Sequence, residues 1–152
     1  MDKMERCKMA NEWHDRGFNC AQSVLAAFAD RIGMPMQELL SLAGGFGAGT
    51  GTGELCGAVS GAVMALGLMT PVDLEQPVVS KKRTLELSKE FQKRFTGIFE
   101  GLRCSDLIQK KYVPDEKTSA AAELGISAHC AVMIVTAVEI LTDMLEEREA
   151  QA

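Results

Sequence analysis

The stretch AVMIVTAVEIL at residues 131–141 decides the fold, because a helix formed from it is apolar on nearly every side. Such a helix must be surrounded by other elements, so we expect it to lie at the centre of the core. Ser127 is expected to cap its start, which would place Cys130 at the third helical position. The acidic tail at residues 143–150 would then extend it into solvent.

Helical patterns also cover most of the remaining chain, at residues 1–17, 20–32, 36–45, 54–69, 78–99 and 104–112. Asn19 is a suitable N-cap for the second of these segments. No sustained alternation of apolar and polar residues indicates strands. We therefore expect an all-α fold, a single-domain bundle of roughly five to seven helices over residues 1–152, with a glycine-rich loop before a buried helix.

The glycine-rich loop reads GGFGAGTGTGELCGAVSG at residues 44–61, with eight glycines in eighteen residues. Glycine in such numbers is unfavourable in helix interiors, so the loop is expected to bring backbone close to a ligand or a neighbouring helix. The expected cofactor-binding residues are Gly45, Gly47, Gly49, Gly51, Gly53 and Gly57. Gly57, Gly61 and Ala65 also predict a smooth stripe for close helix packing. The period-two spacing gives neither GxGxxG nor GK[ST], which argues against nucleotide binding.

The composition excludes several classes of protein. A net charge of −5 and a pI near 5.1 argue against nucleic-acid binding. No apolar run approaches the roughly twenty residues that span a bilayer, and the N-terminus lacks the apolar core of a secretory signal. An odd count of five cysteines without an export signal favours reduced thiols or a metal site over a disulfide framework. The expected location is the cytoplasm.

Four of the cysteines share a local setting, because Cys20, Cys56, Cys104 and Cys130 each fall near the start of an expected helix. The unpaired N–H groups and the dipole of a helix start stabilise a thiolate and lower the pKa of the thiol. If the four starts converge, they form a site for a thiolate-bound metal or a redox centre, which the glycine loop could line. The alternative is that each cysteine packs as a small hydrophobe. Cys7 has the weakest case for a role.

Other polar residues carry weaker signals. His129 beside Cys130, or His14, could supply a nitrogen ligand or a proton relay, although a lone histidine is more often structural. Arg103 could lower the pKa of its neighbour Cys104. The basic residues from Lys81 to Arg94 predict a solvated surface or, as the alternative, a docking face for an acidic redox partner. No acid–base pair stands out, so catalysis is left open.

The chain resembles a known family in NCAQSVLAAF (19–28), ELCGAVSGAVMALGL (54–68), a cysteine at 104 and HCAVMIVTAVEIL (129–141). It is similar to the C_GCAxxG_C_C family, named for four cysteines and a Cys-Gly-Ala-x-x-Gly motif. Cys56, Gly57, Ala58 and Gly61 match this motif, and the resemblance covers roughly residues 4 to 145. The family's four cysteines fall on Cys20, Cys56, Cys104 and Cys130, and Cys7 lies outside the pattern.

The resemblance implies a small, mostly helical protein that is assumed to be redox-active, an oxidoreductase or the partner of one. It leaves three interpretations of the four cysteines. They could hold an iron–sulfur cluster or another metal for electron transfer, or act as a dithiol/disulfide couple. In the third, the chain is a non-enzymatic binding module with a structural zinc or inert cysteines. No CxxCH motif is present, so covalent haem is not expected. A redox partner protein is expected, and the oligomeric state, homo-oligomer included, is left open.

Overall fold

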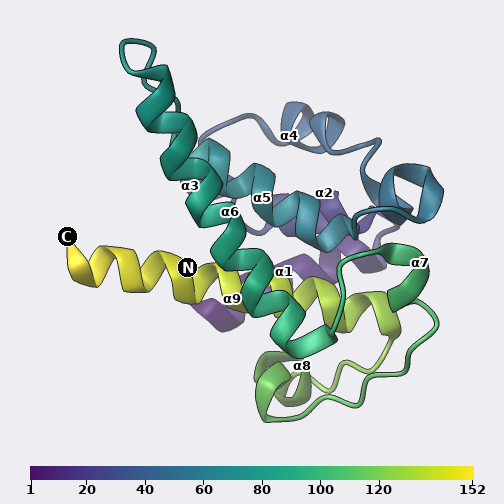
Figure 1. Cartoon of the computed structure of the whole chain (residues 1–152). Coiled ribbons are helices and arrows are strands. Elements are labelled where there is room, and N and C mark those ends of the chain that lie inside the picture. The colour runs from purple at the N-terminus through teal and green to yellow at the C-terminus, as the bar shows by residue number, and fades with distance from the viewer.

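The computed structural model describes residues 1–152 and is a bundle of helices without strands, as the sequence predicts (Figure 1). One isolated antiparallel bridge joins Leu55 to Arg103. The elements are α1 (Lys3–Asp15), α2 (Cys20–Ala26), α3 (Ala29–Ile32), α4 (Met36–Leu42), η1 (Gly49–Gly53), α5 (Gly57–Met69), α6 (Pro77–Phe99), α7 (Cys104–Leu107), η2 (Glu116–Thr118), α8 (Ser119–Glu123) and α9 (His129–Gln151).

The last helix, α9, lies at the centre of the bundle. It packs against α1, α2, α5, α6 and α8, and every residue from 131 to 142 is buried. The prediction of a central C-terminal helix is therefore confirmed. Its cap is not the predicted one, because Ala128 rather than Ser127 precedes the helix and no side chain caps it. Cys130 is consequently the second residue of α9.

The long helix α6 covers the core with one aromatic face, as its amphipathic pattern predicts. Phe91, Phe95 and Phe99 are fully buried, and the rings of the last two lie 4.7 Å apart. Figure 1 shows α6 crossing the bundle, with its first turns projecting from the body together with the loop that precedes them.

Helices α2 and α5 meet closely through the predicted glycine stripe. A Cβ atom added at Gly61 would lie 2.8 Å from the carbonyl oxygen of Ala21, and one added at Gly57 would lie 2.9 Å from the Cβ of Cys20. Only glycine allows this approach, so the prediction of close packing at these two positions is confirmed. The approach brings the start of α5 directly beside the start of α2.

The chain turns more often than the helical pattern predicts. The expected helix over residues 20–32 is divided into α2 and α3 by a break at Ala27 and Phe28. Helix α5 begins at Gly57, three residues after the expected start, so Cys56 precedes the helix instead of lying in its first turn. The segment η1 is a turn rather than a regular helix, because Ala48, Thr50 and several of its glycines have positive φ.

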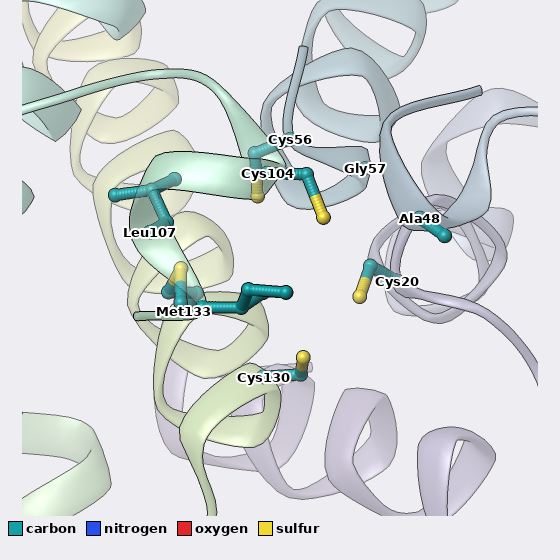
Figure 2. A pocket seen from close by; sticks show the side chains of 9 residues that line it. Cys20, Ala48, Cys56, Gly57, Cys104, Leu107, Cys130 and Met133 are labelled. Atoms are coloured by element: carbon teal, nitrogen blue, oxygen red, sulfur yellow. The ribbon is translucent and has the colours of Figure 1, made fainter. Parts of the chain in front are cut away.

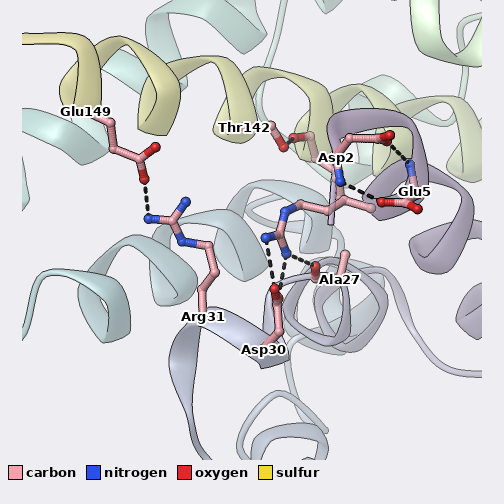
Figure 3. Close-up of polar contacts among 9 residues, drawn as sticks. Asp2, Glu5, Ala27, Asp30, Arg31, Thr142 and Glu149 are labelled. Carbon is pink, nitrogen blue, oxygen red and sulfur yellow. Dashed lines mark hydrogen bonds and ion pairs between the residues drawn. The ribbon is translucent and has the colours of Figure 1, made fainter.

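A buried arginine fixes the end of α2 against α1 (Figure 3). The guanidinium of Arg6 donates to the carbonyl oxygen of Ala27 at 2.8 Å and to the carboxylate of Asp30 at 2.6 and 3.0 Å. It also lies 5.0 Å from the centre of the Phe28 ring. These contacts satisfy the carbonyl that the break after α2 leaves free, and they hold in place the helix that begins with Cys20.

None of the helices combines the length and the apolar character that a membrane span requires.

Candidate functional site

Four cysteines line one cavity of about 320 Å³. Figure 2 shows the sulfur atoms of Cys20, Cys56, Cys104 and Cys130 directed toward the same hollow from different sides. The four residues belong to the start of α2, the residue before α5, the start of α7 and the start of α9. The complete lining is Cys20, Ala48, Cys56, Gly57, Cys104, Leu107, Ile108, Cys130 and Met133. The structure therefore brings together the four cysteines that the sequence singles out.

Cys20 is positioned by the N-cap of its helix. The side chain of Asn19 accepts from the N–H of Gln22 at 2.8 Å, while the Gln22 side chain accepts from the N–H of Asn19 at 2.9 Å. Asn19 also donates to the carbonyl oxygens of Ala43 and Gly44. The prediction of Asn19 as N-cap is confirmed, while the reciprocal bond from Gln22, which completes a capping box, was not predicted. The additional bonds of Asn19 attach the start of α2 to the beginning of the glycine loop.

Cys56 and Cys104 are held side by side by backbone hydrogen bonds. The N–H of Cys56 donates to the carbonyl oxygen of Leu102 at 2.7 Å, and the N–H of Cys104 donates to that of Glu54 at 2.6 Å. These two bonds surround the bridge between Leu55 and Arg103. Two segments nearly fifty residues apart thus form one wall of the cavity.

The glycine loop packs behind the cysteines. A Cβ atom at Gly47 would lie 2.5 Å from the Cβ of Asn19, and one at Gly49 would lie 3.0 Å from the Cβ of Cys104. Gly49 also has a φ of +61°, a conformation that glycine adopts without strain. The loop therefore allows the residues that carry sulfur to approach one another.

Among the six glycines expected to bind a cofactor, Gly57 lines the cavity directly. Gly53 lies beside Ser105, the residue after Cys104, and Gly45 and Gly51 have open space where a side chain would be. A binding role for these glycines stays a prediction. Ala48 of the loop also lines the cavity, although the sequence did not indicate it. Its φ is +51°.

Burial controls the charge of most of these thiols. It raises the pKa of Cys56 to about 11, although the N–H groups of Ala58 and Val59 act in the opposite direction. Burial also raises the pKa of Cys104, and the charge of Cys130 adds to this effect. The prediction that a helix start lowers the thiol pKa is wrong for these two residues. Loss of hydration in the apolar cavity outweighs the field of the helix.

Cys20 and Cys130 behave differently, because their side chains interact with each other in the cavity. The contact raises the pKa of Cys20, with burial as a further cause, and it lowers the pKa of Cys130. Both shifts have the same contact as their largest cause, so the two thiols titrate as a pair. The pair comes from the first residue of α2 and the second residue of α9.

The remaining lining is apolar and comes from the same helices. Leu107 and Ile108 follow Cys104 by three and four residues, and Met133 follows Cys130 by three. Residues three or four apart lie on the same face of a helix. Apolar residues at these distances from each cysteine are therefore the sequence signal that could have identified the rest of the lining. An apolar lining favours neutral thiols, and a set of thiolates there would need a positively charged group to balance it.

The other candidates lie outside the cavity lining. Cys7 is fully buried, and its sulfur lies 3.6 Å from the carbonyl oxygen of Val135. His129 packs near Tyr112, with ring centres 6.0 Å apart, and its Nε2 is buried without a hydrogen-bond partner. His14 lies partly exposed on α1, and Arg103 forms an exposed ion pair with Glu54 at 3.4 Å.

The cavity cysteines are the candidate ligands for a bound group. No set of three or more His, Cys, Asp or Glu side chains is arranged to hold a single metal ion. The four cysteines are part of the lining of a partly open cavity of about 320 Å³. Four cysteine thiolates are also the usual ligand set of iron–sulfur clusters. The same four donors also occur in structural zinc sites, so the identity of any bound group stays a prediction.

An all-α bundle with four cysteines around one apolar cavity defines a class of small cysteine-centred helical proteins. The comparison with protein families gives the particular one: the chain belongs to the C_GCAxxG_C_C family, described as "Putative redox-active protein", whose pattern matches residues 18–144. The match includes all four cavity cysteines and leaves Cys7 outside, in agreement with the resemblance found in the sequence. No curated protein and no solved structure matches this chain.

Proposed function

We propose that this protein is an electron-transfer or redox protein in which Cys20, Cys56, Cys104 and Cys130 ligate an iron–sulfur cluster. The observation that carries the proposal is the direction of the four sulfurs into one apolar cavity (Figure 2). When bound, such a cluster supplies one-electron redox chemistry. The chain supplies the thiolate donors, excludes water through Leu107 and Met133, and sets the backbone position of each cysteine.

Each cysteine has a defined part in this arrangement. Cys56 is the least accessible of the four, at 6% exposed, and it directly precedes α5, whose first N–H groups act to lower the pKa of its thiol. Hydrogen bonds from N–H groups to thiolate sulfur raise the reduction potential of a cluster. Cys104 is less enclosed and lies on the short helix α7, beside the exposed Ile108. This side of the cavity is the expected route for assembly and for contact with a redox partner protein.

Anaerobic reconstitution tests the proposal. The metal-free protein is incubated with iron and sulfide, and bound iron, bound sulfide and the visible absorption spectrum are measured. We expect a coloured protein with iron and sulfide in a fixed ratio to the chain. Changing any one of the four cysteines to alanine should remove most of the absorption. A colourless wild-type protein without bound iron would reject the cluster, and stoichiometric zinc would support a structural metal site instead.

Cys7→Ala is the matched control for these variants. Cys7 is also buried in the core, but its sulfur contacts Val135 and does not line the cavity. Its replacement removes a buried thiol of the same size and should leave the absorption unchanged. If Cys7→Ala bleaches the protein as strongly as the cavity variants do, the loss reflects unfolding rather than ligation.

A second function is favoured by the contact between Cys20 and Cys130. These two thiols could form a disulfide, losing two protons and passing two electrons to an oxidant such as a small-molecule disulfide. The measurement is a count of free thiols before and after oxidation, with peptide mapping of the bond. Two free thiols should disappear per chain on oxidation. Either single variant, Cys20→Ala or Cys130→Ala, should prevent the disulfide from forming. All five cysteines are free thiols, which suits a reducing compartment such as the cytoplasm.

A further inference from the structure

The long helix α6 presents a continuous exposed face on the side opposite its buried phenylalanines. Val78, Lys82, Leu85, Lys89 and Lys93 follow one another at intervals of three or four residues, and all are exposed. We refer to these five residues as the α6 outer face. In Figure 1 the first turns of α6 project from the body, so the beginning of this face is free of neighbouring elements.

Exposed apolar side chains gather at the projecting end. Five of the nine large hydrophobic residues that are exposed in the whole chain lie there: Val72 (62%), Leu74 (85%), Val78 (69%), Val79 (60%) and Leu85 (53%). Single exposed hydrophobic residues are common, but a group of them on one projecting element indicates an interaction surface. Charged residues lie between these apolar residues and after them along α6.

The charges around this group have no partners within the chain. Lys82, Lys89 and Lys93 take part in none of the ion pairs, and the same holds for Glu75 in the preceding loop and Glu86 beside the face. Farther along the helix, by contrast, Arg94 pairs with Glu90 and Glu147. The outer end of α6 therefore carries both signs of charge, separated along the helix axis and available to a partner.

We propose that the α6 outer face binds the same face of a second copy of this chain, in an antiparallel two-fold pair. A two-fold axis at the level of Thr84 places Lys82 of one copy opposite Glu86 of the other, because they lie two residues before and after Thr84. Glu75 lies in the loop before α6, at the end of the helix that an antiparallel partner brings toward Lys93 of the other copy. The pair of Lys82 and Glu86 then occurs twice, once on each side of the axis, as an isologous interface requires.

The apolar residues fit the same arrangement. Leu85 is one residue from the level of the axis, so it meets Leu85 of the second copy at the centre of the contact. Val78, six residues before the level of the axis, then lies along the alkyl stem of Lys89 of the other copy, five residues after it. The pair has an apolar centre with charged residues around it, which is the usual organisation of a protein interface.

Other partners fit the surface less well. A membrane would receive the projecting loop first, and Asp73 and Glu75 there would oppose contact with anionic lipid. An acidic partner protein would match the lysines but would leave Glu75 and Glu86 facing like charge. A second copy of the chain supplies both signs at the required positions.

Charge exchange between two variants tests the proposal. The mass of the purified protein, kept reduced to prevent disulfides between chains, is measured by sedimentation equilibrium over a range of concentrations. We expect a dimer of the 16.4 kDa chain. Lys82→Glu and Glu86→Lys should each weaken the dimer by about tenfold or more, because each places like charges at two symmetric contacts. An equimolar mixture of the two variants should dimerise again, since each restores the charge that the other lacks.

The controls separate the interface from general effects. Lys8→Glu makes the same change of charge on the exposed side of α1 and should leave the dimer unchanged. Leu85→Asp should abolish the dimer, whereas Val113→Asp, at an exposed apolar residue elsewhere, should not. A protein that is monomeric at every concentration overturns the proposal. So does a dimer that survives Leu85→Asp, or a mixture of the two charge variants that stays monomeric.

Discussion

Gly57 and Cys20 are so close that a Cβ atom on the glycine would lie 2.9 Å from the Cβ of the cysteine. The contact joins the first residue of α5 to the first residue of α2, and both residues line the cavity. Because Gly57 has no side chain, Cys20 can lie against it with its sulfur in the cavity.

Gly57→Ala should therefore destabilise the protein and disturb the cavity together. The added methyl group would meet Cys20 and the carbonyl oxygen of Phe46 at 3.0 Å, and overpacking of this kind costs about 2 kcal/mol. Urea denaturation measures the loss. Gly67→Ala, in the same helix, is the control because nothing lies within 4 Å of its added atom. That variant should gain about 0.5 kcal/mol, the usual effect of replacing a helical glycine. Equal losses in both variants would contradict the role given to Gly57.

Asn19→Ala should cost about 1–2 kcal/mol, because it removes a helix N-cap. It also removes the bonds from Asn19 to Ala43 and Gly44, so the start of α2 separates from the glycine loop. Thermal unfolding measures the change. Ser127→Ala is the matched control, since Ser127 resembles a cap in the sequence but no side chain caps α9. A loss in the control as large as that in Asn19→Ala would show that Ser127 caps the helix after all.

Asp30→Asn should destabilise the protein by about 2 kcal/mol, because it leaves the buried guanidinium of Arg6 without its charged partner. The exposed pair of Arg31 and Glu149, drawn beside it in Figure 3, provides the comparison. Arg31→Gln should cost about 0.5 kcal/mol or less, as exposed pairs usually do. Chemical denaturation at neutral pH gives both values.

The same pair predicts a dependence on acid. The hydrogen bonds from Arg6 lower the pKa of Asp30 below its ordinary value of 3.8. A depressed carboxyl pKa stabilises the folded state above the unfolded pKa, and this contribution is lost as the pH falls through the folded value. The difference in stability between wild type and Asp30→Asn should therefore be constant above pH 5 and decrease below pH 4. A difference that stays the same at pH 3 would contradict the assignment.

Alkaline pH should destabilise the metal-free protein through its buried thiols. Burial raises the pKa of Cys56 from 9.0 to about 11, so the folded state holds a proton that the unfolded chain releases. The contribution of the Cys56 thiol to the stability of the fold is therefore fully present below pH 9 and is lost as the pH rises toward 11. Between pH 8 and pH 10 the wild type should lose about 1 kcal/mol more than Cys56→Ala, by the conversion of one pKa unit. Identical losses would show that Cys56 is not the group responsible.

The sequence was sufficient where local pattern determines the structure. The apolar run at residues 131–141 and the spacing of Phe91 and Phe95 identified the two long helices, because periodicity and burial act along one element. The capping role of Asn19 followed from residue type. The shared setting of the cysteines also indicated that they belong together.

Features that depend on distant parts of the chain could not be predicted in this way. The backbone bonds between Glu54 and Cys104 join segments with no common signal in the sequence. At the break after α2, the carbonyl oxygen of Ala27 accepts a hydrogen bond from the side chain of Arg6, which lies 21 residues earlier in the chain. The sequence predicts a lowered pKa for the Cys56 thiol, because a helix start can be recognised from neighbouring residues. The pKa is raised instead, because burial depends on how the whole bundle packs.

The cavity has a consequence for how the protein would respond to losing whatever it binds. Its four sulfurs divide the chain into intervals of 36, 48 and 26 residues, so a group bonded to all of them acts as a cross-link across three long loops. Such a link stabilises the folded chain in proportion to the disorder that it removes from the unfolded one. Resistance to unfolding would then report occupancy, and an empty molecule would be the first to be degraded.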